Sequence, residues 1–179
     1  MKLGVMCSGN GSNFENIVRT CREDEVVLMI YNKEGCGAHK RAAKLGIPSC
    51  CIKSKDEDKI IREFKWAGVE LVVLAGWMRI VTKNLIEAFP DRIINIHPSL
   101  LPKHKGLDVV KRAMDAGDIV TGCTVHYVTE ELDSGSIICQ AEVPILPDDT
   151  VESLTRAIQR QEYTILPEAI KHVKHKIQT

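Results

Sequence analysis

Two polar side chains that could carry proton chemistry stand close together in the middle of the sequence. Asn95 and His97 lie two residues apart in Asn-Ile-His-Pro-Ser, so an extended backbone points both to the same side. An imidazole that titrates near neutral pH and an amide that donates hydrogen bonds could protonate a leaving group and hold an oxyanion. The alternative is a strand-end histidine bonded only to a backbone carbonyl, but the paired asparagine favours catalysis.

An acidic turn, Asp133-Ser134-Gly135, follows later in the sequence. Taken alone, these residue types favour an ordinary turn in which the aspartate bonds its own backbone. A carboxylate beside a histidine, however, favours the charged imidazole and supports proton transfer near neutral pH. A catalytic role for Asp133 therefore depends on the chain folding back to place it beside His97.

A glycine-containing loop near the amino terminus could bind an anion. Gly11, Ser12 and Asn13 follow an apolar run and precede an amphipathic segment, where a helix start exposes free N–H groups. The loop lacks the Gly-Lys-Ser/Thr ending of a P-loop, and Phe14 occupies the third glycine position of the dinucleotide fingerprint. The alternative is a tight turn that only caps the helix; we favour phosphate binding.

Other polar residues have simpler explanations at this level. Gln159 and Glu162 are about one helical turn apart and fit a solvated helix face. His126 stands in an apolar run and fits a core histidine with satisfied ring nitrogens. The basic tripeptide Lys103–Lys105 fits a solvated loop.

Alternating apolar runs and amphipathic segments predict the scaffold that must position these residues. Strands are predicted at Leu3–Met6, Val26–Ile30, Ser49–Ile52, Val69–Ala75 and Arg92–His97, and helices at Phe14–Cys21, Ala38–Leu45 and Asp56–Ala67. A further helix is expected to be capped by Thr82 and to end before Pro90. Continuous apolar strands separated by helices predict a parallel sheet covered on both faces. Ligands bind such sheets at the carboxyl ends of the strands.

The pattern changes after Gly106. A helix at Leu107–Ala116 precedes strands at Val120–Val128 and Ile137–Val143, whose short connection predicts antiparallel pairing. Thr150 opens a long helix that Pro167 should break or kink. The fold class is therefore α/β, a mainly parallel twisted sheet with helices on both faces and antiparallel strands added in the C-terminal half. We expect one domain over residues 1–179, divided into halves near residues 90 and 91.

Composition excludes several functional classes. The 179 residues include 24 Lys and Arg and 24 Asp and Glu, and this zero net charge disfavours a nucleic-acid partner. No apolar run approaches the roughly 20 residues of a membrane helix, and the first residues do not form a signal peptide. Seven cysteines without a CxxC pair predict reduced thiols in a cytoplasmic protein. Cys36 and His39 resemble half a metal site, but no second half has suitable spacing, so no metal is predicted.

Four segments together resemble a known family. Gly9–Asn13, Leu74–Ile80, Asn95–Pro102 and Glu131–Gly135 are similar to the phosphoribosylglycinamide formyltransferases of purine biosynthesis, and the likeness runs from Lys2 to about Pro167. The resemblance implies a Rossmann-like formyltransferase fold with a phosphate-binding half at about 1–90 and a folate and catalytic half at about 91–179. It also implies transfer of the formyl group of 10-formyltetrahydrofolate to glycinamide ribonucleotide, without a metal.

The resemblance assigns residues as well. It implies that Asn95, His97 and Asp133 form the catalytic set. By the same likeness Gly11, Ser12 and Asn13 bind the substrate phosphate, and Gln159 and Glu162 bind the glycinamide end, against the solvated-face interpretation. The implied folate-binding residues are Met78, Arg79, Ile80, Val81, Asn95, Thr129, Glu130, Glu131, Leu132 and Asp133, with Lys53, or Lys55 nearby, standing where many members have an arginine.

Two departures from the family pattern are visible. The segment after Gly106 lacks a histidine found in some members, and the sequence ends at Thr179, before a C-terminal extension of some relatives. Two other functions remain open. One is a related folate enzyme, either a formyl-folate hydrolase or a transferase acting on charged tRNA or a sugar nucleotide, although such enzymes usually carry an extra domain. The other is a non-catalytic nucleotide-binding module. We expect small-molecule substrates, no nucleic acid, no membrane, and a monomer or homodimer.

Overall fold

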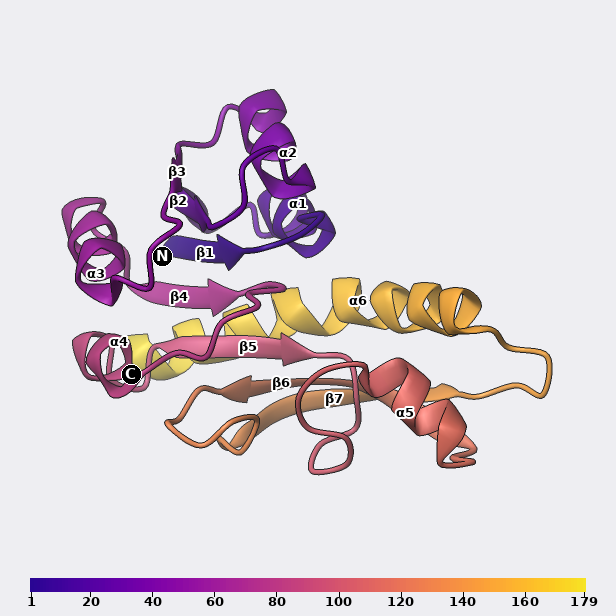
Figure 1. Cartoon of the computed structure of the whole chain (residues 1–179). Helices are drawn as coiled ribbons and strands as arrows, with labels where there is room; N and C mark the ends of the chain where they lie inside the picture. Colours follow the sequence, from indigo (N-terminus) through magenta and orange to yellow (C-terminus); the bar gives the residue numbers. More distant parts are fainter. The chain divides into compact units, whose positions relative to one another are not determined.

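The computed structural model describes residues 1–179, which form two compact units, Met1–Asn95 and Ile96–Thr179. The division falls a few residues after the expected one. Strand β5 (Ile93–His97) spans it, so Asn95 ends the first unit and His97 lies in the second. Figure 1 follows the chain through both units by colour.

The first unit alternates strands and helices as predicted. Its elements are β1 (Lys2–Cys7), α1 (Ser12–Thr20), β2 (Glu25–Tyr31), α2 (Gly37–Leu45), β3 (Ser49–Cys51), α3 (Glu57–Trp66), β4 (Leu71–Leu74), α4 (Lys83–Ala88) and the start of β5. The strands pair in parallel in the order β3-β2-β1-β4-β5. All four residues of β4 are buried, and so are the last five of β1, as strands covered on both faces require.

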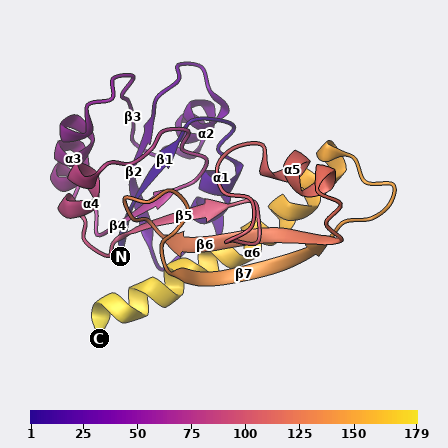
Figure 2. The same cartoon turned by 60° about the horizontal axis from the view of Figure 1, so that its bottom comes forward.

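Helices cover both faces of these strands, which confirms the prediction. Helices α1 and α2 lie on one side, and α3 and α4 lie on the other, in both views (Figures 1 and 2). Close packing on the second side depends on Gly4 of β1, where a Cβ would lie 2.7 Å from the ring of Phe64 in α3. The Phe64 ring also meets the Phe89 ring edge-on, with centroids 6.2 Å apart.

Helix α4 begins as predicted after Thr82, but its cap has a different origin. The Thr82 side chain makes no capping bond to its own helix. The carboxylate of Glu57, in the first turn of α3, instead accepts the backbone N–H groups of Thr82 and Leu85 at 2.8 and 3.1 Å. These N–H groups have no partner inside the helix, so a distant carboxylate replaces the local cap.

The second unit contains α5 (Val109–Asp115), β6 (Val120–Tyr127), β7 (Ile137–Pro144) and α6 (Val151–Gln178). Strands β6 and β7 are antiparallel, as predicted, and Figure 2 shows their arrowheads at opposite ends. The prediction for α5 was wrong at its start. Asp108 has a left-handed φ of 54°, so the helix begins at Val109 rather than Leu107.

Of the two predicted effects of Pro167, a break or a kink, the break does not occur. Helix α6 is 28 residues long and continues through the proline. Apolar side chains are buried both before and after the proline, at Ile165, Leu166, Ala169 and Ile170. This continuous buried face offsets the hydrogen bond that proline cannot donate.

All seven cysteines are free thiols. Burial is the largest influence on the pKa values of Cys123 and Cys139, raising them to about 12 and about 11. Neither thiol therefore ionises near neutral pH. None of the helices combines the length and apolarity that crossing a membrane requires.

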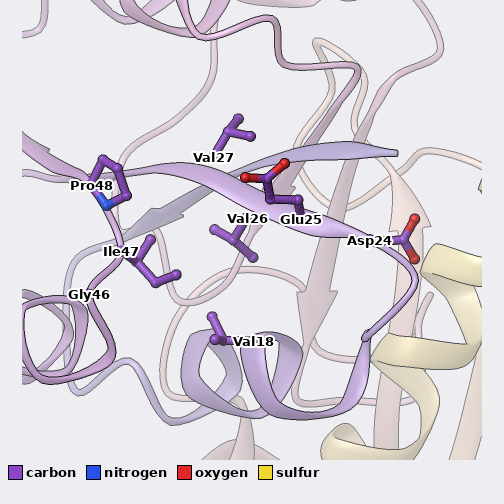
Figure 3. A pocket seen from close by; sticks show the side chains of 8 residues that line it. All are labelled: Val18, Asp24, Glu25, Val26, Val27, Gly46, Ile47 and Pro48. Atoms are coloured by element: carbon purple, nitrogen blue, oxygen red, sulfur yellow. The ribbon is translucent and has the colours of Figure 1, made fainter.

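A pocket of about 320 Å³ opens at the start of β2 (Figure 3). Its lining comes from α1, from the start of β2 and from the α2–β3 connection, and consists of Val18, Asp24, Glu25, Val26, Val27, Gly46, Ile47 and Pro48. The pocket lies at the amino end of β2, and its lining includes none of the predicted site residues.

Candidate functional site

The predicted phosphate loop in the first unit is shaped by a close backbone approach. Helix α1 begins at Ser12, and its N-cap, Gly11, has a left-handed φ of 76°. A Cβ at Gly11 would lie 2.6 Å from Cα of Ala38, so only glycine fits this position. The N–H groups of Ser12 and Asn13 therefore lie in the first turn of α1, where an anion is favoured.

Helix α2 holds this loop from outside. The Arg41 guanidinium donates to the carbonyl of Asn10 at 2.8 Å and pairs with Glu15 of α1 at 2.7 Å. The Ala38 N–H also donates to the Gly9 carbonyl. The loop shape is thus set by contacts within the unit before any ligand binds.

Ser8 joins the loop to the segment after β4. Its buried hydroxyl accepts the Met78 N–H at 2.9 Å, and its own N–H donates to the Gly76 carbonyl at 2.9 Å. Within Met78–Val81, the predicted folate segment, the Met78 and Ile80 side chains are 64% and 67% exposed, while Val81 is buried. Two apolar side chains are therefore exposed on a segment whose backbone is held by Ser8.

Arg79, in the same segment, is used within the protein. Its guanidinium donates to the carbonyls of Ser54 and Lys53, the former at 2.7 Å, and lies over the Trp77 ring at 5.8 Å. The Lys53 ammonium pairs with Glu34 at 3.0 Å, and the hydrogen bond that it donates to Glu34 raises the pKa of Lys53. Both side chains of this ion pair are exposed, and the folate contact of Lys53 stays a prediction.

His97 and Asp133 come together in the second unit. Nδ1 of His97 lies 3.6 Å from Oδ2 of Asp133, and both side chains are only 7% exposed. The interpretation of Asp133-Ser134-Gly135 as an ordinary turn is therefore incomplete, because the turn also places the Asp133 carboxylate beside the His97 imidazole. Asp133 itself has a left-handed φ of 50°, and its Oδ2 accepts the Gly106 N–H at 2.8 Å.

The turn that carries Asp133 bonds to itself. The Thr129 hydroxyl donates to the Glu131 carbonyl at 3.1 Å, and the Ser134 hydroxyl donates to the Leu132 carbonyl at 3.0 Å. Glu130 and Glu131 are exposed, and Leu132 is 48% exposed. Residues 129–132 of this turn are therefore exposed, and their folate contacts stay a prediction.

The solvated-loop interpretation of Lys103–Lys105 was wrong. The His104 carbonyl accepts a hydrogen bond from Nε2 of His97 at 2.9 Å, and Nζ of Lys105 donates to the Ser134 hydroxyl at 2.6 Å. A carbonyl oxygen can only accept, so Nε2 is the protonated nitrogen of the neutral His97 ring. Nδ1 then carries the lone pair, and it faces Asp133.

His126 was identified as a satisfied core histidine, and it is buried with Nδ1 bonded to the Tyr127 carbonyl at 2.9 Å. Sequence reasoning missed its second neighbour, since Nε2 lies 3.8 Å from Oδ1 of Asp133. The pKa of His126 is lowered, mainly by burial and against the opposing effects of Tyr127 and Asp133. The only sequence signal was the position of His126 in the apolar run that forms β6. Consecutive residues of β6 are buried, so the pattern of apolar and polar residues could not show which group His126 faces.

The other predicted residues lie on β5 and α6. Asn95 pairs in register with Leu74 of β4 and is half-buried, two residues before His97 in β5. Glu162 of α6 is buried, so its solvated-face interpretation was wrong, and Gln159 is half-buried on the same helix. Residues 1–179 contain no cluster of three or more histidine, cysteine or acidic side chains suited to a metal ion.

Each unit therefore holds part of the predicted set. Gly11, Ser12, Asn13, Lys53, Met78, Arg79, Ile80, Val81 and Asn95 belong to the first unit, and His97, Thr129, Glu130, Glu131, Leu132, Asp133, Gln159 and Glu162 belong to the second. Within the second unit the structure supplies a histidine whose tautomer is fixed by a carbonyl and whose other nitrogen faces a carboxylate. Such a pair can move one proton to or from a reacting atom.

Comparisons with known proteins identify the family of this chain. The family model for formyl transferases matches residues 1–170. A phosphoribosylglycinamide formyltransferase from Bacillus subtilis is 39% identical and aligns over 96% of this chain and 94% of its own length. A crystal structure of the protein of that name from Anaplasma phagocytophilum has a TM-score of 0.95 and 38% identity, over 98% of this chain and 88% of that one.

Longer relatives also match. A trifunctional purine biosynthetic protein of Drosophila pseudoobscura pseudoobscura is 44% identical over 94% of this chain, and the chain spans 13% of its length. The observed α/β fold, with parallel strands first and an antiparallel pair later, agrees with the solved structures. With 170 residues matched and two full-length relatives aligned, the chain belongs to the formyl transferase family.

Proposed function

We propose that this chain transfers the formyl group of 10-formyltetrahydrofolate to the amine of N1-(5-phospho-D-ribosyl)glycinamide in de novo purine biosynthesis. The observation that carries the proposal is the buried His97–Asp133 pair at 3.6 Å. The chain that contains this pair aligns over nearly its full length with proteins named phosphoribosylglycinamide formyltransferase. The products are the N2-formyl compound and tetrahydrofolate. The enzyme acts in the cytoplasm, as a monomer or homodimer, with small-molecule substrates and without metal, nucleic acid or membrane.

The reaction moves one acyl group and one proton. The amine nitrogen attacks the formyl carbon, a new C–N bond forms, and the carbonyl oxygen becomes an oxyanion. The bond from that carbon to the folate nitrogen then breaks, the carbonyl re-forms, and the folate nitrogen takes a proton. The amine loses a proton, so no net acid or base is consumed, but a group must hold a proton at the reacting atoms.

His97 carries that proton on Nδ1. Nε2 is occupied by the His104 carbonyl, so only Nδ1 changes protonation during the reaction. Protonation at Nδ1 creates an imidazolium beside the Asp133 carboxylate, and the opposite charge stabilises it. The imidazolium donates to the leaving folate nitrogen, and with the amide of Asn95 it stabilises the oxyanion. Asp133 orients the ring and helps manage the amine proton.

His126 does not share this role. Its Nδ1–H is committed to the Tyr127 carbonyl, and burial lowers its pKa, so the ring is neutral near pH 7. In this tautomer Nε2 of the neutral ring is unprotonated, and at 3.8 Å from Oδ1 of Asp133 it donates no hydrogen bond to that carboxylate. Of the two histidines, His97 is therefore the one whose protonated ring the Asp133 carboxylate stabilises.

The remaining residues bind the substrates. The backbone amides of Gly11, Ser12 and Asn13 receive the phosphate at the start of α1. Gln159 and Glu162 hold the glycinamide end. The proposed folate contacts are Met78, Arg79, Ile80, Val81, Asn95 and residues 129–133. The backbone of residues 129–133 holds the pterin ring, and Lys53 contacts the folate tail.

The function predicts acceptor-dependent chemistry. With 10-formyltetrahydrofolate labelled with ¹³C in the formyl group, tetrahydrofolate should appear only when the glycinamide ribonucleotide is present. The label should appear in the product amide, as measured by absorbance and mass spectrometry. Tetrahydrofolate release without acceptor would instead identify a hydrolase, and no release in either mixture would identify a binding module.

The phosphate loop predicts a selective defect in Gly11→Ala. The new Cβ meets Cα of Ala38, so the loop amides shift and KM for the ribonucleotide should rise about tenfold, or about 1.4 kcal/mol. KM for the folate should change little. Gly35→Ala is the matched control, because Gly35 has a similar φ of 69° but no atom within 4 Å. Equal KM values in the two variants would contradict the phosphate assignment.

The lowered pKa of His126 predicts a pH-dependent stability. Between the folded pKa and the unfolded value near 6.5, the unfolded state binds more protons, so the free energy of unfolding falls as pH decreases. One such group contributes a slope of at most about 1.4 kcal/mol per pH unit. His126→Asn keeps a donor for Tyr127 and should flatten the slope measured by urea unfolding from pH 7.5 to 5.5. An unchanged slope would show that His126 is not held neutral.

A further inference from the structure

The carbonyl that fixes His97 belongs to a strained residue. His104 has a left-handed φ of 54°, a conformation that residues with a Cβ adopt only when their surroundings hold it. Its carbonyl accepts both Nε2–H of His97 at 2.9 Å and the hydroxyl of Ser99 at 3.1 Å. Something must keep His104 in this conformation, since relaxation of its backbone would turn the carbonyl away from His97.

The His104 side chain is held by an acidic residue that catalysis does not use. Nε2 of His104 lies 2.7 Å from Oδ2 of Asp118, and Nζ of Lys103 lies 3.4 Å from Oδ1 of the same carboxylate. The His104 and Asp118 side chains are 17% and 14% exposed, whereas Lys103 is 68% exposed. The contact between His104 and Asp118 is thus short and mostly shielded from water, unlike an ordinary surface pair.

Asp118 stands on a rigid support. It follows α5, where its N–H donates to the Ala113 carbonyl at 3.1 Å, and the next residue, Ile119, accepts the Ile145 N–H at 3.0 Å. The hydrogen bond from His104 is the largest cause of the lowered pKa of Asp118, so the carboxylate stays ionised at neutral pH. It remains an acceptor throughout the pH range in which His97 would act.

We propose that Asp118 is a positioning residue for formyl transfer: it holds the His104 ring and so fixes the backbone carbonyl that keeps the proton of His97 on Nε2. The proposal rests on the proposed role of His97. Asp118 touches neither substrate nor reacting atoms, and its effect passes through His104. Without it, His104 relaxes, the Nε2–H bond is lost, and the tautomer with the proton on Nδ1 becomes populated.

The test compares Asp118→Ala, Asp118→Asn and the control Asp115→Ala. Asparagine keeps an oxygen that can accept from His104, whereas alanine does not. The control removes the exposed Lys111–Asp115 pair on α5, which has no contact with His104 in the structure. Asp118→Ala should lower kcat about 10- to 100-fold with both KM values within about twofold, since misplacement affects the reacting geometry more than binding. Asp118→Asn should retain most activity and Asp115→Ala all of it.

Two readouts separate positioning from stability alone. The alkaline limb of the kcat–pH profile should move to lower pH in Asp118→Ala, because the carbonyl stabilises the charged ring more than the neutral one. A double variant with His104→Ala should lose no more activity than the larger single loss, because the two side chains act as one unit.

The ¹⁵N–¹H correlation spectrum of His97 tests the proposal even if the chain has no transferase activity. It should report protonated Nε2 in the wild type and in Asp115→Ala, and mixed tautomers in Asp118→Ala. Wild-type kcat, pH profile and tautomer in Asp118→Ala would overturn the proposal. A normal tautomer response without any formyl transfer would overturn the proposed function and leave the positioning by Asp118 standing.

Discussion

A carboxylate that is almost fully shielded from water needs polar groups around it, and Asp133 obtains them from three separate segments of its unit. Its Oδ2 accepts the Gly106 N–H and faces Nδ1 of His97, and its Oδ1 faces His126. This demand ties the 129–135 turn, the connection after β5 and strand β6 into one arrangement. Asp133 itself has a left-handed backbone with a φ of 50°, a conformation that its surroundings must hold.

The first unit is organised around a different constraint. Its loop between β1 and α1 must keep backbone N–H groups available, so other residues supply the bonds that fix its shape. Arg41 binds the Asn10 carbonyl, and Ser8 binds both Gly76 and Met78. Arg79 plays the same part for residues 53 and 54. The Arg41 side chain thus serves the structure of the loop, and the proposed recognition of the phosphate depends on the backbone.

Most of the fold could be predicted because it depends on local periodicity. Apolar runs and helical spacing located every strand and helix to within a few residues. The errors arose where distant contacts override local preference. The buried face of α6 carries the helix through Pro167, the left-handed Asp108 delays α5, and Glu57 caps a helix that Thr82 was expected to cap itself. None of these contacts has a signature in the surrounding sequence.

The site was predictable to a different degree. Spacing alone joined Asn95 to His97, and the glycine loop could be located from the residues around it. The pairing of Asp133 with His97 needed the family resemblance, because a turn sequence does not specify what it faces. His126 was located only as a core histidine, and no sequence signal linked His104 or Asp118 to His97, since these links are contacts of the folded chain.

The central claim is that the charge of Asp133 supports proton transfer at Nδ1 of His97, and kcat of Asp133→Asn tests it most directly. Asparagine tolerates the left-handed backbone and keeps an oxygen for the Gly106 N–H, so the substitution removes the charge with little change of shape. The account predicts that kcat falls by about 10²- to 10⁴-fold while both KM values stay close to wild type. A variant that retained kcat within a few-fold would contradict it.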